Sequence, residues 1–123
     1  MKFEFYNPTE EKGSCIIRTF TKLLNKEPNK VKQELIELAK ELNYDSYKDI
    51  EVFEEYFNRN NYEKIHTYDN KLIKNIELEQ GKYAIFCYDK KEYYHIFAVV
   101  DNVVYDKSSS CFELYVISTY RLK

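Results

Sequence analysis

The feature that most constrains the fold is a change in hydrophobic periodicity at Gln80-Gly81. Before this point the apolar residues recur every three or four positions, which is typical of helices that bury one face. After it, the chain is dense in Tyr, Phe, Val and Ile, which favour the half-buried surface of a sheet. A helical half followed by a strand-forming half predicts an α+β domain with an antiparallel sheet.

Three helices are predicted in the first half of the chain. The first spans residues 14–25, and the second begins at Pro28, because proline suits the first turn of a helix. The third begins at Ser46, which together with Asp49 resembles a capping box, and ends near the asparagines of residues 58–61. The buried face of the first helix comprises Ile16, Ile17, Phe20, Leu23 and Leu24.

The second half is predicted to form four strands, with a tight hairpin turn at Asp101-Asn102, since Asp and Asn tolerate positive φ. Residues 71–78 fit either a short helix or an extended connection. Residues 1–12 contain Asn7-Pro8 and are predicted to form an arm or loop ahead of the helices, within a single domain of residues 1–123. The predicted strands are residues 82–88, 93–100, 103–107 and 112–121.

The bulk properties exclude several classes of function. The chain has 123 residues and a formal net charge of −2, so no overall positive field attracts nucleic acid. No apolar run is long enough to cross a membrane, and the N-terminus lacks the apolar core of a signal peptide, so a cytoplasmic protein is expected. Three cysteines without a C-x-x-C spacing indicate neither a disulfide framework nor a zinc site, and we expect no metal and no cofactor.

Cys15 is the candidate nucleophile, because Gly13-Ser14-Cys15 opens the first predicted helix. Unpaired backbone N–H groups and the helix dipole at that end favour the thiolate, the reactive form of cysteine. A histidine nearby would complete an activated nucleophile. The chain has two: His95 lies in a predicted strand, whereas His66 lies in a polar stretch and is interpreted as solvated surface. The two other cysteines, Cys87 and Cys111, are interpreted as packing residues.

The predicted hairpin allows a test of which carboxylate accompanies His95. With Asp101 and Asn102 as the turn, residue 97 lies opposite Asp106, and residues two apart on a strand share a face. His95 and Asp106 are therefore diagonal cross-strand neighbours within reach of each other. Asp101 lies about 20 Å along the strand from His95 and is out of reach. Asp106 is thus predicted to bond His95.

These residue types predict a covalent hydrolytic mechanism. Cys15 would attack a carbonyl carbon, His95 would act as general acid and base, and Asp106 would orient the imidazole. The backbone N–H of Cys15 is a natural donor to the oxyanion. Asn7, the one amide side chain upstream of Cys15, is the candidate for a second donor.

Two segments carry a resemblance to a known family. Residues 13–18, Gly-Ser-Cys-Ile-Ile-Arg, resemble the Gly-Asp-Cys-Val-x-Arg segment of small papain-like proteases of bacteria and phages. Residues 94–106 resemble their histidine strand, turn and strand ending in Tyr-Asp. The layout is also similar to that of double-glycine leader peptidases, which process bacteriocin precursors. The resemblance implies a papain-like fold, a cysteine peptidase or amidase acting on a peptide, isopeptide or related acyl bond, and a peptide or protein substrate.

The sequence departs from the family motif at two positions, and several of the candidate residues have an alternative structural interpretation. Ser14 stands where the family has Asp, and Thr9 where it has Gln, so an alternative is a catalytically inactive papain-like interaction protein of a phage or mobile element. Arg18 either raises the local positive potential or makes a structural ion pair. Tyr93 and Tyr94 either line a groove or pack across strands. The alternative for Cys15 and His95 is that both are ordinary buried residues of the core.

Overall fold

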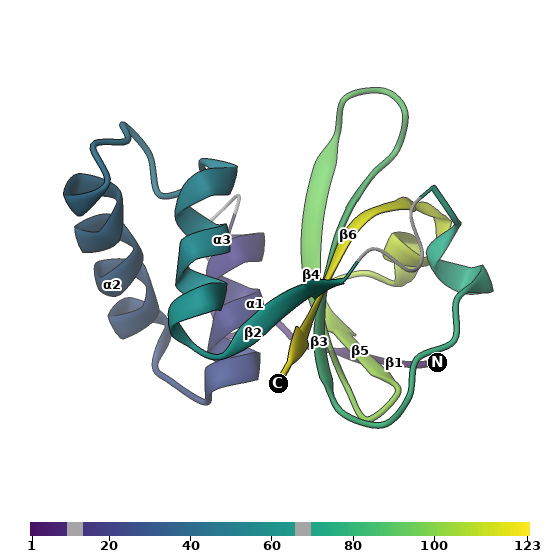
Figure 1. Cartoon of the computed structure of the whole chain (residues 1–123). Helices are drawn as coiled ribbons and strands as arrows, with labels where there is room; N and C mark the ends of the chain where they lie inside the picture. The colour runs from purple at the N-terminus through teal and green to yellow at the C-terminus, as the bar shows by residue number, and fades with distance from the viewer. Residues whose placement is uncertain (10–13, 66–69) are drawn as a thin grey trace.

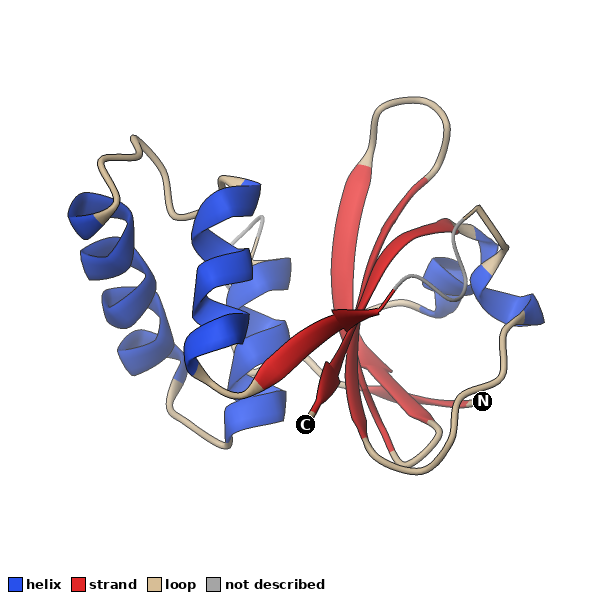
Figure 2. Cartoon of the chain, viewed as in Figure 1, coloured by secondary structure: helices blue, strands red, loops and turns tan. Residues whose placement is uncertain are grey.

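The computed structural model describes residues 1–9, 14–65 and 70–123 (Figure 1). Three α-helices cover one face of a six-stranded sheet, and two short 3-10 helices lie on the opposite face (Figure 2). The predicted α+β class is confirmed. Gly13 and His66 lie outside the described residues. No helix of the described chain is long and apolar enough to span a membrane.

The helices are α1 (Cys15–Leu24), α2 (Pro28–Glu41) and α3 (Ile50–Arg59). The first two begin where proline and the apolar pattern predict. The predicted start of the third helix at Ser46 is wrong, because Asp49 precedes its first residue. The Ser46 hydroxyl instead accepts a hydrogen bond from the Lys48 backbone N–H (3.0 Å), which closes a turn before the helix.

The sheet is mixed, so the prediction of a purely antiparallel sheet is wrong. Its order is β1-β5-β4-β3-β6-β2, and β1 pairs with β5 in parallel while the other neighbours are antiparallel. The strands are β1 (Lys2–Phe5), β2 (Tyr62–Ile65), β3 (Lys82–Tyr88), β4 (Tyr94–Val100), β5 (Val103–Asp106) and β6 (Tyr115–Leu122). The segment predicted as an N-terminal arm therefore supplies an edge strand, and a second edge strand, β2, follows the helices.

The last strand also begins later than predicted. Residues Ser109–Glu113 form the 3-10 helix η2, and β6 starts at Tyr115 instead of residue 112. The undecided segment 71–78 forms a 3-10 turn, η1 (Ile73–Asn75), beside an isolated bridge from Leu72 to Tyr115. Both 3-10 helices lie on the sheet face away from α1 and bury apolar side chains there (Figure 2).

The hairpin between β4 and β5 forms as predicted. Asp101 (φ 49°) and Asn102 (φ 66°) both adopt the left-handed conformation that a two-residue turn requires. Val100 pairs with Val103, which is the predicted register. The Asp101 carboxylate accepts a hydrogen bond from the Gly81 backbone N–H (3.1 Å), so the turn is also tied to the start of β3.

Strand β4 is buried on both of its faces. Ile96 and Ala98 pack in the cluster beneath the helices, whereas Phe97 and Val99 pack in the cluster beneath the 3-10 helices. This division follows from the alternation of side chains along a strand. Two separate apolar clusters thus fix the strand that carries His95.

Candidate active site

Cys15 is the first residue of α1, the helix that packs against β4. Backbone N–H groups in the first turn of a helix have no partner within the helix, and the dipole favours negative charge there. Ser14 precedes Cys15 without a side-chain capping bond; its hydroxyl accepts a hydrogen bond from Arg18 Nη1 (3.5 Å) instead. The thiol is therefore held, partly buried, at the end of the helix that stabilises a thiolate.

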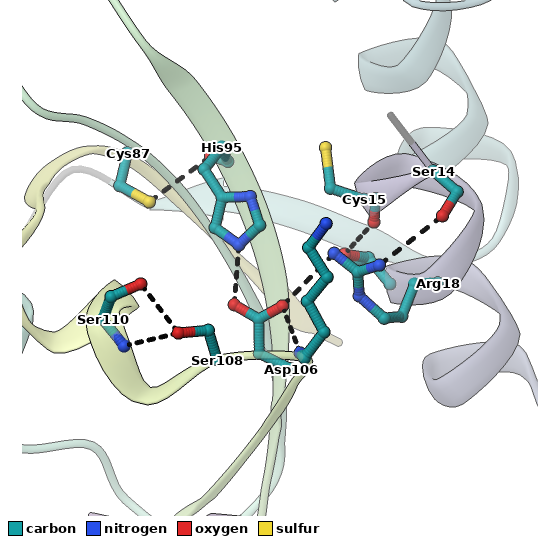
Figure 3. A network of polar contacts seen from close by, with 10 residues as sticks. Ser14, Cys15, Arg18, Cys87, His95, Asp106, Ser108 and Ser110 are labelled. Carbon is teal, nitrogen blue, oxygen red and sulfur yellow. Dashed lines mark hydrogen bonds and ion pairs between the residues drawn. The ribbon is translucent and has the colours of Figure 1, made fainter. Parts of the chain in front are cut away.

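His95 and Asp106 form a short, buried hydrogen bond. The distance from His95 Nε2 to Asp106 Oδ2 is 2.6 Å, and the side chains are 6% and 1% exposed. This bond confirms the prediction that Asp106, and not Asp101, accompanies His95. Because Nε2 is engaged, Nδ1 is the ring nitrogen left for another partner, and it lies on the side of the ring that faces Cys15 (Figure 3).

The environments of Cys15 and His95 favour a thiolate–imidazolium pair. Burial raises the pKa of the Cys15 thiol, but a hydrogen bond and the positive charge of His95 outweigh burial, so the pKa is lowered. The Ile96 backbone N–H and the charge of Arg18 act in the same direction. Burial lowers the pKa of His95, whereas Asp106 and Cys15 raise it, to about 9. Each group therefore stabilises the charged form of the other.

Arg18 makes the buried ion pair that was one of its two predicted roles. Its Nη2 lies 3.3 Å from Asp106 Oδ1, and the two side chains are 3% and 1% exposed. The Lys107 backbone N–H donates to the same Oδ1 at 2.8 Å. Each oxygen of the Asp106 carboxylate thus has its own partners, with His95 on Oδ2, and the carboxylate is fixed in orientation.

The other two cysteines have the properties of packing residues. Cys87 lies opposite His95 on β3, and its thiol donates a hydrogen bond to the His95 carbonyl (3.3 Å). Burial raises the pKa of Cys87 well above its ordinary value. Burial and the neighbouring Asp106 raise the pKa of Cys111 to about 12. Both thiols are therefore neutral, in agreement with the sequence interpretation.

Two cavities meet at His95. One has a volume of about 530 Å³ and an almost entirely apolar wall that also includes Cys15. The other, of about 290 Å³, has a wall of mixed polar and apolar character that includes Asp106. Tyr94 lines the first cavity, and Tyr93 lines the second, with its ring stacked on the imidazole at 6.0 Å between centroids. Both tyrosines are more than half exposed and line a cavity, and Tyr94 also stacks across the strands on Phe86 and Tyr88.

Of the two predicted oxyanion donors, one lies beside the apolar cavity and the other lies outside both cavities. The Cys15 backbone N–H has the position predicted for it, at the first turn of α1. Asn7 is exposed and lines neither cavity. It follows Tyr6, whose backbone N–H donates to the Asp106 carbonyl (2.8 Å), so its backbone runs past the same end of the sheet. Its role as an oxyanion donor stays a prediction.

No metal centre accompanies these residues: the described ranges contain no group of three or more His, Cys, Asp or Glu side chains placed to hold an ion. No protein-family model, curated protein or solved structure matches the chain. The geometry of the site therefore has to carry its functional interpretation.

Proposed function

We propose that this protein is a papain-like cysteine hydrolase that cleaves a peptide, isopeptide or related acyl bond through Cys15, His95 and Asp106. One observation carries the proposal: the thiol at a helix N-terminus has a lowered pKa beside an imidazole that is held by a buried carboxylate at 2.6 Å. A nucleophile, a base and an orienting group in hydrogen-bonding contact are the common signature of covalent acyl transfer.

In the first step the Cys15 thiolate attacks the carbonyl carbon of the substrate and forms a C–S bond. The carbonyl electron pair moves to the oxygen, which the backbone N–H of Cys15 stabilises. When this intermediate collapses, the C–N bond breaks, and the leaving amine takes a proton from His95. Nδ1 supplies that proton, since Nε2 is bonded to Asp106.

In the second step water hydrolyses the thioester. His95, now neutral, removes a proton from water as its oxygen attacks the carbonyl carbon, and the C–S bond then breaks. The products are a carboxylic acid and the regenerated Cys15 thiolate beside the imidazolium. Asp106 keeps the same ring orientation in both steps, because its carboxylate is fixed by other partners.

The apolar cavity supports a peptide or protein substrate. A side chain packed against its wall would contact both Cys15 and His95, which brings a neighbouring bond close to the thiol. Pockets of a few hundred Å³ with apolar walls and a few polar groups are typical of ligand sites. The wall comprises Cys15, Ile16, Lys48, Ile50, Phe53, Phe86, Tyr94, His95 and Ile96.

The test uses an N-blocked peptidyl chloromethyl ketone, whose methylene carbon binds a thiolate as chloride leaves, followed by mass spectrometry of the labelled peptides. We expect one label at neutral pH, on Cys15, lost in Cys15→Ser and in His95→Ala and kept in the matched control Cys111→Ala. A fluorogenic peptide library then measures turnover. Labelling without turnover of any peptide would favour the inactive interaction protein, and slow, equal labelling of all three cysteines would contradict both the thiolate and the proposal.

A further inference from the structure

Arg18 is a buried charge that neither donates nor accepts a proton in the hydrolytic steps above. It belongs to α1, one turn after Cys15, so that the nucleophile and this guanidinium project from the same region of one helix. Its Nη2 pairs with Asp106 at 3.3 Å, and both side chains are at least 97% buried. Buried ion pairs carry a large desolvation cost, which makes a purely stabilising role a weak explanation.

The contacts of Arg18 connect Asp106 on the sheet with Ser14 at the start of α1. One nitrogen holds the Asp106 carboxylate, which bonds His95, and another donates to the Ser14 hydroxyl at the residue that precedes Cys15. Figure 3 shows the guanidinium between the carboxylate and the start of the helix. A planar guanidinium can hold two acceptors in fixed directions, which the single ammonium of a lysine cannot do.

Arg18 compensates the negative charge of Asp106. The reactive pair contributes one negative and one positive charge, and Asp106 contributes a further negative charge, which Arg18 compensates. Among the described residues, the other titratable groups that interact with the Asp106 charge include Cys111 from η2, Cys87 from β3 and Tyr93 from the loop before β4, and none of these three supplies a positive charge.

We propose that Arg18 is a positioning residue of the active site: it fixes the Asp106 carboxylate in the orientation that His95 requires, and it holds a positive charge one helical turn from Cys15. This inference rests on the proposed hydrolase. Arg18 touches neither the substrate nor the reacting atoms in this account. It acts through Asp106 and through the local potential at Cys15.

The test compares two variants by the pH dependence of Cys15 alkylation with iodoacetamide. Arg18→Met removes the charge and keeps the length of the side chain, whereas Arg18→Lys keeps the charge and loses the planar fork. We expect Arg18→Met to shift the acid limb of the alkylation profile to higher pH, with roughly a tenfold lower rate at pH 6 for a shift of one unit. Arg18→Lys should keep the acid limb near that of the wild type but reduce the rate of labelling by the peptidyl chloromethyl ketone.

A double-mutant cycle keeps the inference testable if Arg18→Met fails to fold. Arg18→Met combined with Asp106→Asn removes both charges and leaves neither buried alone. If Arg18 acts on His95 through Asp106, ketone labelling of the double variant should be no slower than that of Asp106→Asn when both are measured at a pH where the Cys15 thiol is fully ionised. A slower rate in the double variant at that pH would overturn the positioning role.

Two further outcomes separate this inference from the proposed function. If His95→Ala abolishes the low-pH reactivity of Cys15 while a folded Arg18→Met variant keeps the wild-type profile, the hydrolase proposal stands and the role of Arg18 is wrong. If His95→Ala leaves Cys15 as reactive as in the wild type, the proposed function itself fails.

Discussion

Cys15 and Cys111 line the two cavities that meet at His95, yet their thiol pKa values move in opposite directions. Both thiols are partly or fully buried, and burial alone raises a thiol pKa. Next to Cys15 lies the positive imidazolium, and its pKa falls. At Cys111, burial and then the negative Asp106 carboxylate raise the thiol pKa to about 12.

All three thiols are at least partly buried, so the reactive thiol is distinguished by a positive neighbour: the His95 imidazolium outweighs burial at Cys15, whereas burial and the Asp106 carboxylate act in the same direction at Cys111. The same His95–Asp106 pair presents its positive end to the helix terminus and its negative end to η2. Cys87, across the strand from His95, donates a hydrogen bond to the His95 backbone carbonyl, and burial is the main cause of its raised pKa. The His95–Asp106 pair thus separates Cys15 from Cys111, whereas burial is the main reason that Cys87 is inert.

The largest expected effect comes from removing either the nucleophile Cys15 or the imidazole of His95. Cys15→Ser and His95→Ala should each lower turnover by ~10⁴–10⁶-fold, and the double variant should lose no more, because the two groups act as a unit. The measurement is kcat/KM on a peptide substrate found in the library screen. Cys111→Ala is the matched control and should keep its activity, and full activity in Cys15→Ser would exclude covalent catalysis by the thiol.

Removing the Asp106 charge should lower the stability of the protein strongly and its activity less than the loss of His95 does. In Asp106→Asn the Arg18 guanidinium remains buried without its carboxylate, which costs about 3–5 kcal/mol of unfolding free energy. Activity should fall less than in His95→Ala, because an amide oxygen can still orient the ring. Urea unfolding followed by circular dichroism checks the cost. Asp101→Asn, the same change in the hairpin turn, is the control, and an equal loss in both variants would argue against a special role for the ion pair.

The reactive pair should exist only in a window of pH. The thiolate forms as the pH rises through the lowered pKa of Cys15, and the imidazolium is lost as the pH rises through about 9. We therefore expect a bell-shaped profile of kcat/KM whose alkaline limb lies near pH 9, with about a tenfold loss per pH unit beyond it. An alkaline limb near pH 6.5, the ordinary value for histidine, would show that Asp106 and Cys15 do not raise the pKa of His95.

The smallest effect on Cys15 reactivity is expected for Tyr93, whose ring is stacked on the His95 imidazole. Tyr93→Ala removes the aromatic contact with His95, which lies at 6.0 Å between centroids, and should cost about 0.5–1.5 kcal/mol of stability. The alkylation rate of Cys15 should stay within a few-fold of the wild type, since Tyr93 lines the other cavity. Tyr94→Ala, next along the strand, is the comparison. A larger loss of Cys15 reactivity in Tyr93→Ala than in Asp106→Asn would contradict the account.

The parts of the site that local rules determine could be predicted from the sequence. The two-residue turn at Asp101-Asn102 depends only on residues that tolerate positive φ, and the period of two along a strand then sets which carboxylate reaches His95. Pro28 and the apolar pattern likewise determined where α1 and α2 begin.

Features that depend on distant parts of the chain could not be predicted in this way. Strands β1 and β2 are four residues long and gain their hydrogen bonds from β5 and β6, which lie far away in the sequence. The bond from Arg18 to Asp106 requires α1 to be docked on the sheet, so its spacing from Cys15 was the only sequence signal. The lowered thiol pKa depends on the same docking.

The most direct test of the central claim is the alkylation rate of each cysteine in the folded protein as a function of pH, measured with iodoacetamide and peptide mass spectrometry. We predict that Cys15 reacts at lower pH than an ordinary cysteine and depends on His95, while Cys87 and Cys111 stay unreacted until the protein unfolds. Three slow rates that rise together near pH 9, unchanged in His95→Ala, would contradict it.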